Sequence, residues 1–171
     1  MRPMTMDKAQ VTLPGDREVK VTRSFRAPRA LVYRAYTESE LVRRWLLGPP
    51  GWSMPVCEMD VCVGGRFKWR WRSEENGSEF GFSGAFREVQ PSSKIVHTQA
   101  YEPGTVGGGC PGDDAIVTVS FTEDGGVTTV ATLIDFGSKE ARDAALATGM
   151  TDGMEQSYQL LDLLVNEQSR A

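Results

Sequence analysis

The segment at residues 66–72 constrains the fold most, because large aromatic and basic side chains alternate along it. The aromatic residues are Phe67, Trp69 and Trp71, and the basic residues between them are Arg66, Lys68, Arg70 and Arg72. Successive side chains of a strand point to opposite faces, so the segment predicts a strand with one buried and one solvated face. On a chain with a net charge of -4, we interpret the basic row as a solvated face and not as a surface for nucleic acid.

The next predicted strand repeats this arrangement with Phe80, Phe82 and Phe86, interrupted by Gly84. Two neighbouring strands would then place six aromatic rings on one side of a sheet, and that side must be covered. The apolar stripe that can cover it lies near the C-terminus and consists of Met150, Met154, Tyr158, Leu161 and Val165, at helical spacing. The polar residues of the same segment, expected to face outward, are Asp152, Glu155, Gln159, Asp162 and Asn166.

The remaining pattern predicts an α+β chain with a meander of antiparallel strands. Strands are expected at residues 17–25, 52–61, 65–73, 78–89, 94–102, 115–123 and 127–136. A helix should begin at Pro28, a second short helix should cover residues 38–47, and residues 138–168 should be helical with an interruption near Thr148 and Gly149. The expected architecture is a curved antiparallel sheet wrapped around a long C-terminal helix, with two short helices after the first strand.

The domain organisation follows from the positions of the turn-forming residues. Residues 1–16 contain prolines and no sustained period, which predicts a flexible leader, and residues 17–171 form a single domain. Residues 103–114 are rich in glycine and predict a flexible loop.

Composition excludes several classes of function. The acidic balance argues against general binding to nucleic acid, and no apolar run is long enough for a membrane span, so the expected location is the cytoplasm. The cysteines Cys57, Cys62 and Cys110 lack the spacing of a metal site, so neither a metal nor a cofactor is expected. Cys110, in the glycine-rich loop, is the thiol expected to be most exposed.

The aromatic strands and the methionine-containing helix predict a cavity for a small, largely apolar or aromatic ligand. The expected ligand-binding residues are Trp45, Trp52, Phe67, Trp69, Trp71, Phe80, Phe82, Thr132, Met150, Met154 and Tyr158. Trp45 and Trp52 would rim the mouth or cap a core, and Thr132 would offer a hydroxyl to the ligand or to nearby backbone. Gly149 and Gly153 would allow close approach of the sheet or leave space for a ligand, and the helix start could act as a gate.

His97 is the one candidate for acid–base chemistry. It is the only histidine in the chain, and the carboxylates that could orient it are Glu58, Asp60, Glu88 and Asp135. Because no nucleophile or orienting pair is evident, a structural histidine is the preferred interpretation, and the chain is not expected to be an enzyme.

Several motifs, taken in order, resemble one family. They are residues 25–32 (Phe-Arg-Ala-Pro-Arg-Ala-Leu-Val), Trp45 ahead of Gly48-Pro49, residues 64–67 (Gly-Gly-Arg-Phe), residues 84–89 with Pro91, residues 117–122 (Val-Thr-Val-Ser-Phe-Thr), and Gly149-Met150. This order resembles the activator of Hsp-90 ATPase branch of the START-like (SRPBCC) superfamily, over about residues 19–165. The chain departs from the family pattern at Leu46 and Met154, where a tryptophan is common.

The resemblance implies a helix-grip fold with a deep cavity that holds apolar molecules across the superfamily, and it supplies no catalytic residues. A cyclase- or dehydratase-type enzyme acting on an apolar ligand is one alternative function. A co-chaperone or stress-response interaction module is another, and contact with a chaperone is only weakly implied, because the eukaryotic co-chaperone has regions that this chain is too short to contain. The sequence leaves open whether the chain forms a homodimer.

Overall fold

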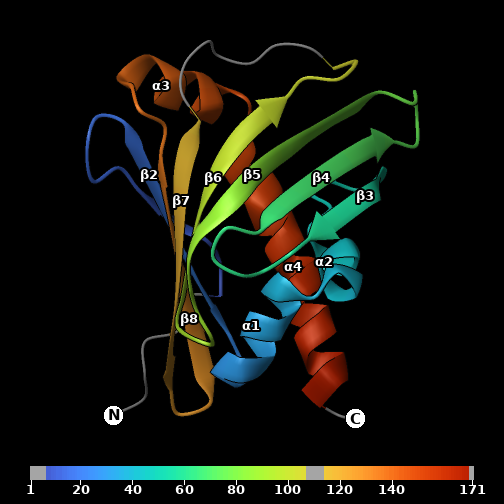
Figure 1. Ribbon diagram of the computed structural model, residues 1–171. Helices are drawn as coiled ribbons and strands as arrows, with labels where there is room; N and C mark the ends of the chain where they lie inside the picture. Colours follow the sequence, from blue (N-terminus) through green and yellow to red (C-terminus); the bar gives the residue numbers. More distant parts are fainter. Residues whose placement is uncertain (1–6, 107–113, 170–171) are drawn as a thin grey trace.

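The computed structural model describes residues 7–106 and 114–169. The strands are β1 (Gln10–Thr12), β2 (Glu18–Phe25), β3 (Trp52–Met59), β4 (Arg66–Ser73), β5 (Glu79–Gln90), β6 (Lys94–Glu102), β7 (Ala115–Asp124) and β8 (Val127–Asp135). The helices are α1 (Arg29–Thr37), α2 (Ser39–Trp45), α3 (Lys139–Ala147) and α4 (Met150–Ser169). Figure 1 shows α1 and α2 at one end of the molecule and α3 at the other.

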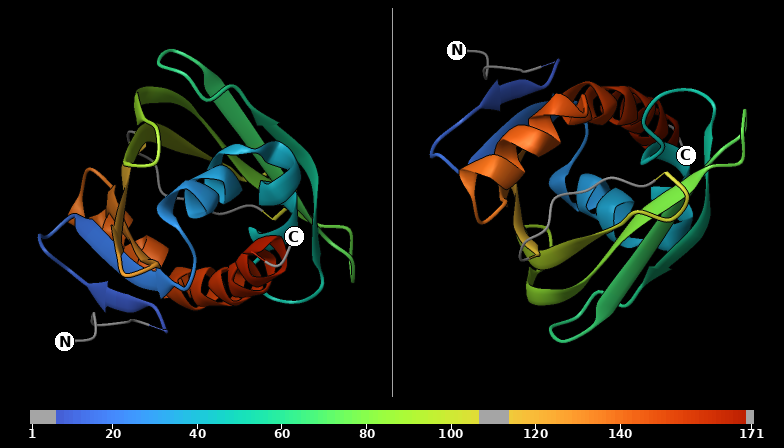
Figure 2. Two further views of the ribbon diagram at one scale, coloured as in Figure 1. Left: turned by 90° about the horizontal axis from the view of Figure 1, so that it is seen from below. Right: turned by 90° about the horizontal axis from the view of Figure 1, so that it is seen from above.

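The strands form one antiparallel sheet in the order β1-β2-β8-β7-β6-β5-β4-β3. The sheet curves around α4, as the views along the molecule show (Figure 2). The α+β helix-grip architecture predicted from the sequence is therefore confirmed. Residues 107–113, which carry most of the predicted flexible loop and Cys110, lie outside the described residues.

Strand β1 is a feature that the sequence interpretation missed. Residues 10–12 pair with β2, with Val11 opposite Val21, so the expectation of a leader without regular structure is wrong there. A strand of three residues with exposed side chains is too short to show an alternating pattern. The edge of β2 supplies the backbone partners that make it a strand.

Local backbone chemistry explains the break between the last two helices. Ser138 caps α3, and its hydroxyl accepts a hydrogen bond from the Ala141 amide over 3.1 Å. Gly149 has a φ of +82°, a left-handed conformation that glycine adopts without strain, and it separates α3 from α4. The interruption predicted near Thr148 and Gly149 is therefore confirmed.

The aromatic register of the sheet depends on Gly84. Gly84 lies opposite Phe67, and a Cβ built at Gly84 would stand 2.0 Å from the Thr98 carbonyl oxygen and 2.7 Å from the Phe67 ring. Only a residue without a side chain fits there. The neighbouring pairs are Trp69 opposite Phe82 and Trp71 opposite Phe80, so the predicted aromatic rows share one face, the concave face of the sheet.

An ionic clamp joins α4 to the sheet. Arg23 of β2 is 2% exposed, and its guanidinium group reaches Glu155 over 3.1 Å and Asp162 over 2.8 Å. The expectation that both carboxylates face outward is wrong, because they lie seven residues apart along the same edge of the apolar stripe and converge on Arg23. Burial on its own lowers the pKa of Arg23, but the hydrogen bonds to Asp162 and Glu155 outweigh it and raise the pKa above its ordinary value.

Candidate functional site

One half of the concave face is filled by side chains. We call it the packed half, and its central residues are Tyr36, Trp45, Phe121, Tyr158 and Leu161, which belong to one hydrophobic core. Trp45, predicted to rim an opening or cap a core, is 2% exposed, and its indole nitrogen donates a hydrogen bond to the Ala35 carbonyl over 2.8 Å. The structure places it in the core beneath α1 and α2 and away from any rim.

The packed half also holds a buried group of hydroxyls. Tyr158 interacts with the hydroxyls of Thr132 and Tyr36, and burial raises the pKa of Tyr158 to about 12. Burial likewise raises the pKa of Tyr36, whose hydroxyl makes no hydrogen bond of regular geometry within the described residues. Thr132, predicted to orient a ligand or to bond to backbone, is 6% exposed and is instead engaged with a tyrosine.

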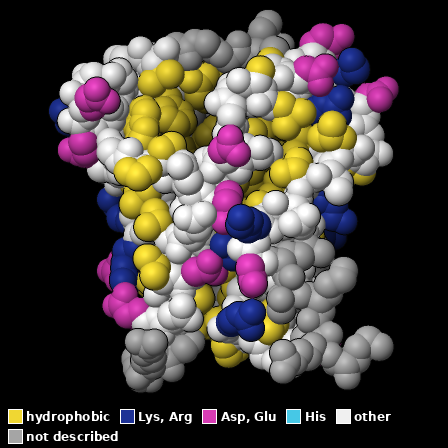
Figure 3. All heavy atoms as spheres, turned by 180° about the vertical axis from the view of Figure 1, so that it is seen from behind, with side chains coloured by type: hydrophobic (Ala, Val, Ile, Leu, Met, Phe, Trp, Pro, Cys, Tyr) yellow, Lys and Arg dark blue, Asp and Glu magenta, His cyan; other side chains and the backbone are white. Residues whose placement is uncertain are grey.

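The other half of the concave face keeps its aromatic side chains half-exposed. We call it the aromatic hollow, and its residues are Trp52, Trp69, Phe80, Phe82 and Tyr101. Pairing across β4, β5 and β6 aligns Trp69, Phe82 and Tyr101, and the Trp52 ring lies 5.3 Å from that of Phe80. Figure 3 shows hydrophobic side chains gathered around a hollowed part of the surface on this side of the molecule.

Beside the aromatic hollow, on the same face of β4, lie two of the predicted ligand-binding residues. Phe67 is 2% exposed and Trp71 is 7% exposed. The Trp71 indole nitrogen donates to the Leu46 carbonyl over 2.6 Å, and its ring stacks on Phe80 at 5.3 Å. These two buried residues flank Trp69 and contact its ring from either side.

The first turns of α4 border this region. Met150 and Met154 are half-buried and pack against the main core. A Cβ built at Gly153 would meet nothing within 4 Å. The sequence offered two explanations for Gly153, close approach of the sheet or space beside the helix. The free space around this Cβ position agrees with the second.

His97 lies in the wall between the two halves. It is 5% exposed, and its ring packs edge to face on Phe67 at 4.8 Å and on Trp69 at 6.1 Å. Its Nδ1 donates to the Thr98 carbonyl over 2.8 Å. Burial lowers the pKa of His97, with the backbone bond acting in the opposite direction, so the ring is neutral at pH 7.

The carboxylates suggested as partners for His97 lie elsewhere. Glu58 is opposite Lys68 on the convex face, Glu88 pairs with Lys94 over 3.4 Å, and Asp135 pairs with Arg17 over 3.1 Å. Asp60 accepts a hydrogen bond from the Cys62 thiol. The structure thus surrounds His97 with aromatic rings, not with an acid that could orient it.

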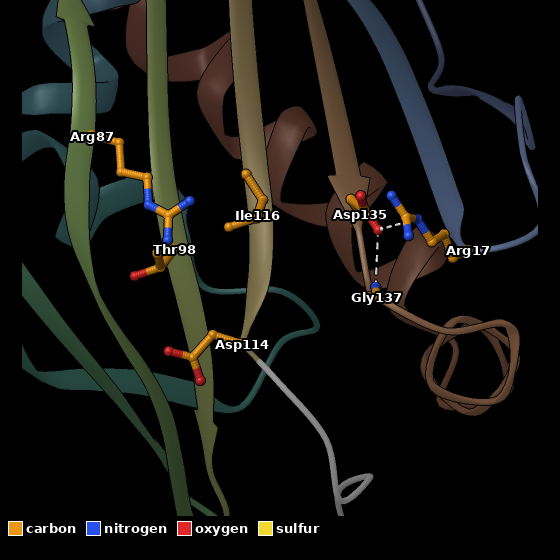
Figure 4. Close-up of a pocket in the computed structure, with 7 residues that line it drawn as sticks. All are labelled: Arg17, Arg87, Thr98, Asp114, Ile116, Asp135 and Gly137. Atoms are coloured by element: carbon orange, nitrogen blue, oxygen red, sulfur yellow. Dashed lines mark hydrogen bonds and ion pairs between the residues drawn. The ribbon is translucent and has the colours of Figure 1, made fainter.

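The convex face carries two shallow depressions. One, of about 570 Å³, is lined by Arg17, Arg87, Thr98, Asp114, Ile116, Asp135 and Gly137 (Figure 4). The other, of about 370 Å³, is lined by Glu58, Arg66, Phe67, Lys68, Ser83 and Glu102. Both are open to solvent, and in the first of them Asp135 pairs with Arg17 and accepts a hydrogen bond from the Gly137 amide.

Other chemistry finds little support in the described residues. No group of three or more histidine, cysteine or acidic side chains there could hold a metal ion. No described helix is long and apolar enough to cross a membrane. Cys57 is buried and Cys62 is exposed.

The sequence interpretation missed Tyr101 and Arg23 as parts of this arrangement. Tyr101 shares the alternation of His97 along β6, so pairing β6 with β5 would have placed it beside Phe82. Arg23 is in phase with Val21 and Phe25 on β2, and an arginine in phase with buried residues is a signal that a carboxylate faces it.

Comparison with known proteins agrees with the fold described above. A protein from Rhodobacter sphaeroides has 26% identity, a TM-score of 0.85, and covers 94% of this chain and 99% of its own. A protein from Chromobacterium violaceum has 26% identity and a TM-score of 0.75, over 88% of this chain and 98% of its own. An AHSA1-like protein from Aeromonas hydrophila, at 18% identity and a TM-score of 0.65, covers 85% of this chain and 93% of its own and shares the fold.

A comparison with curated proteins gave no match. The family description "Activator of Hsp90 ATPase homolog 1-like protein" matches residues 26–166, which is most of the chain and includes both halves of the concave face. This chain therefore belongs to the family of activator of Hsp90 ATPase homolog 1-like proteins.

Proposed function

We propose that the protein binds a small, largely apolar or aromatic molecule in the aromatic hollow. The observation that carries the proposal is that five aromatic side chains stay partly exposed together on the concave face, those of Trp52, Trp69, Phe80, Phe82 and Tyr101. Exposed apolar surface costs free energy in proportion to its area, about 25 cal/mol per Å². A contiguous group of such residues is typical of a binding site.

The contacts of His97 support binding more than catalysis. Catalytic histidines are commonly oriented by a carboxylate, and the Nδ1 hydrogen bond of this ring goes instead to the Thr98 carbonyl. The surrounding rings lower its pKa by desolvation and offer no group to receive a proton. We therefore assign the hollow to binding and propose no reaction.

The proposal can be tested with the full-length protein and a neutral probe such as 2-methylnaphthalene. Native mass spectrometry of freshly purified protein should first show whether a small molecule co-purifies. Titration followed by amide NMR should then shift resonances of β4, β5, β6 and the first turns of α4.

Two variants locate the binding. Phe82→Ala removes a ring of the aromatic hollow and should weaken probe binding at least severalfold. Tyr33→Phe changes an aromatic residue of α1 that contacts Phe121 and should leave binding unchanged. Shifts confined to α1, α2 or the convex face, or equal affinity of Phe82→Ala and wild type, would sink the proposal.

A further inference from the structure

The indole nitrogens of the concave face differ in whether they have a hydrogen-bond partner. Those of Trp45 and Trp71 donate to backbone carbonyls of Ala35 and Leu46, over 2.8 Å and 2.6 Å. The Trp69 nitrogen is also buried, but within the described residues it has no hydrogen-bond partner. A buried donor without an acceptor costs free energy, so its presence in a half-exposed ring calls for an explanation.

A complementary acceptor lies beside Trp69. The ring centroids of Trp69 and His97 are 6.1 Å apart at an interplanar angle of 81°. Because the Thr98 carbonyl can only accept, Nδ1 of His97 carries the proton, and Nε2 of the neutral ring keeps its lone pair. Nε2 is the ring nitrogen farther from the backbone. Two neighbouring rings of this apolar region therefore carry one unpaired donor and one acceptor.

Charge narrows the choice of ligand. None of the five residues of the aromatic hollow carries a charge at neutral pH. The cation on the concave side, Arg23, is already neutralised by Glu155 and Asp162. The strand that carries Trp69 points its basic side chains to the convex face, where Arg70 meets Glu102 over 3.4 Å. A carboxylate or phosphate would lose its water and find no described cation to replace it.

We propose that the ligand is a neutral aromatic molecule with a hydroxyl group that binds between Trp69 and His97. The hydroxyl oxygen accepts the hydrogen bond of Trp69 Nε1, and the hydroxyl proton is donated to His97 Nε2. Trp69 is partly exposed as a residue, and the proposal requires that its ring turns on binding to present Nε1 to the ligand. This inference rests on the proposed function and adds the chemical class of the ligand.

Three probes of matched shape separate the hydrogen bonds from apolar binding. 2-Naphthol donates and accepts, 2-methoxynaphthalene only accepts, and 2-methylnaphthalene does neither. Trp69→Phe should weaken binding of 2-naphthol and 2-methoxynaphthalene by about tenfold relative to 2-methylnaphthalene. His97→Phe should weaken 2-naphthol alone to a similar degree.

A control variant and a spectroscopic signal guard against effects of misfolding. Trp45→Phe removes an indole from the packed half, where its donor already has a partner, and should leave the affinity ratios of the three probes unchanged. In the wild-type protein, the indole proton of Trp69, assigned by its loss in Trp69→Phe, should move downfield with 2-naphthol and not with 2-methylnaphthalene.

The outcomes distinguish the two proposals. If all three probes bind and Trp69→Phe changes their affinities equally, the hydroxyl inference is wrong while the proposed function stands. If no probe binds, both fail. An unmoved indole proton on saturation with 2-naphthol also overturns the hydroxyl inference.

Discussion

The packed half and the aromatic hollow use the same kinds of residue on the same concave face, but only one of them is closed. In the packed half, the ring of Tyr36 on α1 lies 4.8 Å from that of Trp45 on α2 and 5.2 Å from that of Phe121. In the hollow, the aromatic rings of β5 and β6 contact one another, and no ring from a helix covers them among the contacts of the described residues. The aromatic residues alone do not decide whether a part of the concave face is closed. That depends on which part the helices cover.

The largest expected effect is a difference in stability between variants of the packed half and variants of the aromatic hollow. Phe121→Ala should lower the free energy of unfolding by about 3–5 kcal/mol, because its ring is 2% exposed and its loss leaves a cavity. Phe82→Ala should lower it by less than about 2 kcal/mol, because that ring is already half-exposed. Chemical denaturation measures both, and equal losses would contradict the division into halves.

The clamp beside the packed half should be the next most sensitive point. Arg23→Met leaves Glu155 and Asp162 without their buried partner and should cost about 3 kcal/mol in denaturant titrations. Arg26→Met, at a surface pair with Asp7 whose side chains are 69% and 68% exposed, should change stability by less than about 0.5 kcal/mol. A harmless Arg23→Met would show that α4 is held by its apolar stripe alone.

The same clamp predicts a dependence on pH. Burial alone would raise the pKa of Glu155, but hydrogen bonds from Arg23 and from the Ala9 amide lower it below its ordinary value. A depressed folded-state pKa stabilises the protein above the ordinary carboxyl pKa of about 4.3, and this contribution is lost as pH falls through the folded value.

Thermal unfolding of wild type between pH 6 and pH 3, compared with Glu155→Gln, tests this dependence. At pH values below about 4.3, the unfolding temperature of the wild type should decrease more steeply with falling pH than that of the variant. Parallel curves for the two proteins would exclude Glu155 as the titrating group.

The smallest effect concerns the border of the aromatic hollow. Gly153→Ala should stabilise the protein by about 0.5–1 kcal/mol, because helical alanine replaces glycine and the added Cβ meets nothing within 4 Å. Gly149→Ala has the same free space but a φ of +82°, so it should destabilise instead. Thermal melts of the pair check the opposite signs, and destabilisation by Gly153→Ala would mean that this space is occupied in solution.

Much of the fold could be predicted from alternation alone. The aromatic rows of β4 and β5 and the stripe from Met150 to Val165 were visible as periods, and each became the core-facing side of its element. Strand β1 could not be predicted, because a three-residue exposed strand exists only through its partner β2. The same holds for the clamp, where Glu155 and Asp162 look like solvated helix residues until Arg23 is placed between them.

The sequence by itself determined the aromatic and apolar faces of the strands and of the C-terminal helix, because strand and helix periods place such residues on one side by local geometry. It could not tell filled space from open space, and so it grouped Trp45, Thr132 and Tyr158 with Trp52 and Phe82 as one ligand site. Only the tertiary structure separated them, by laying α1 and α2 over one half of the concave face. Whether a buried-looking ring is packed or exposed depends on the element above it, and that element comes from a distant part of the chain.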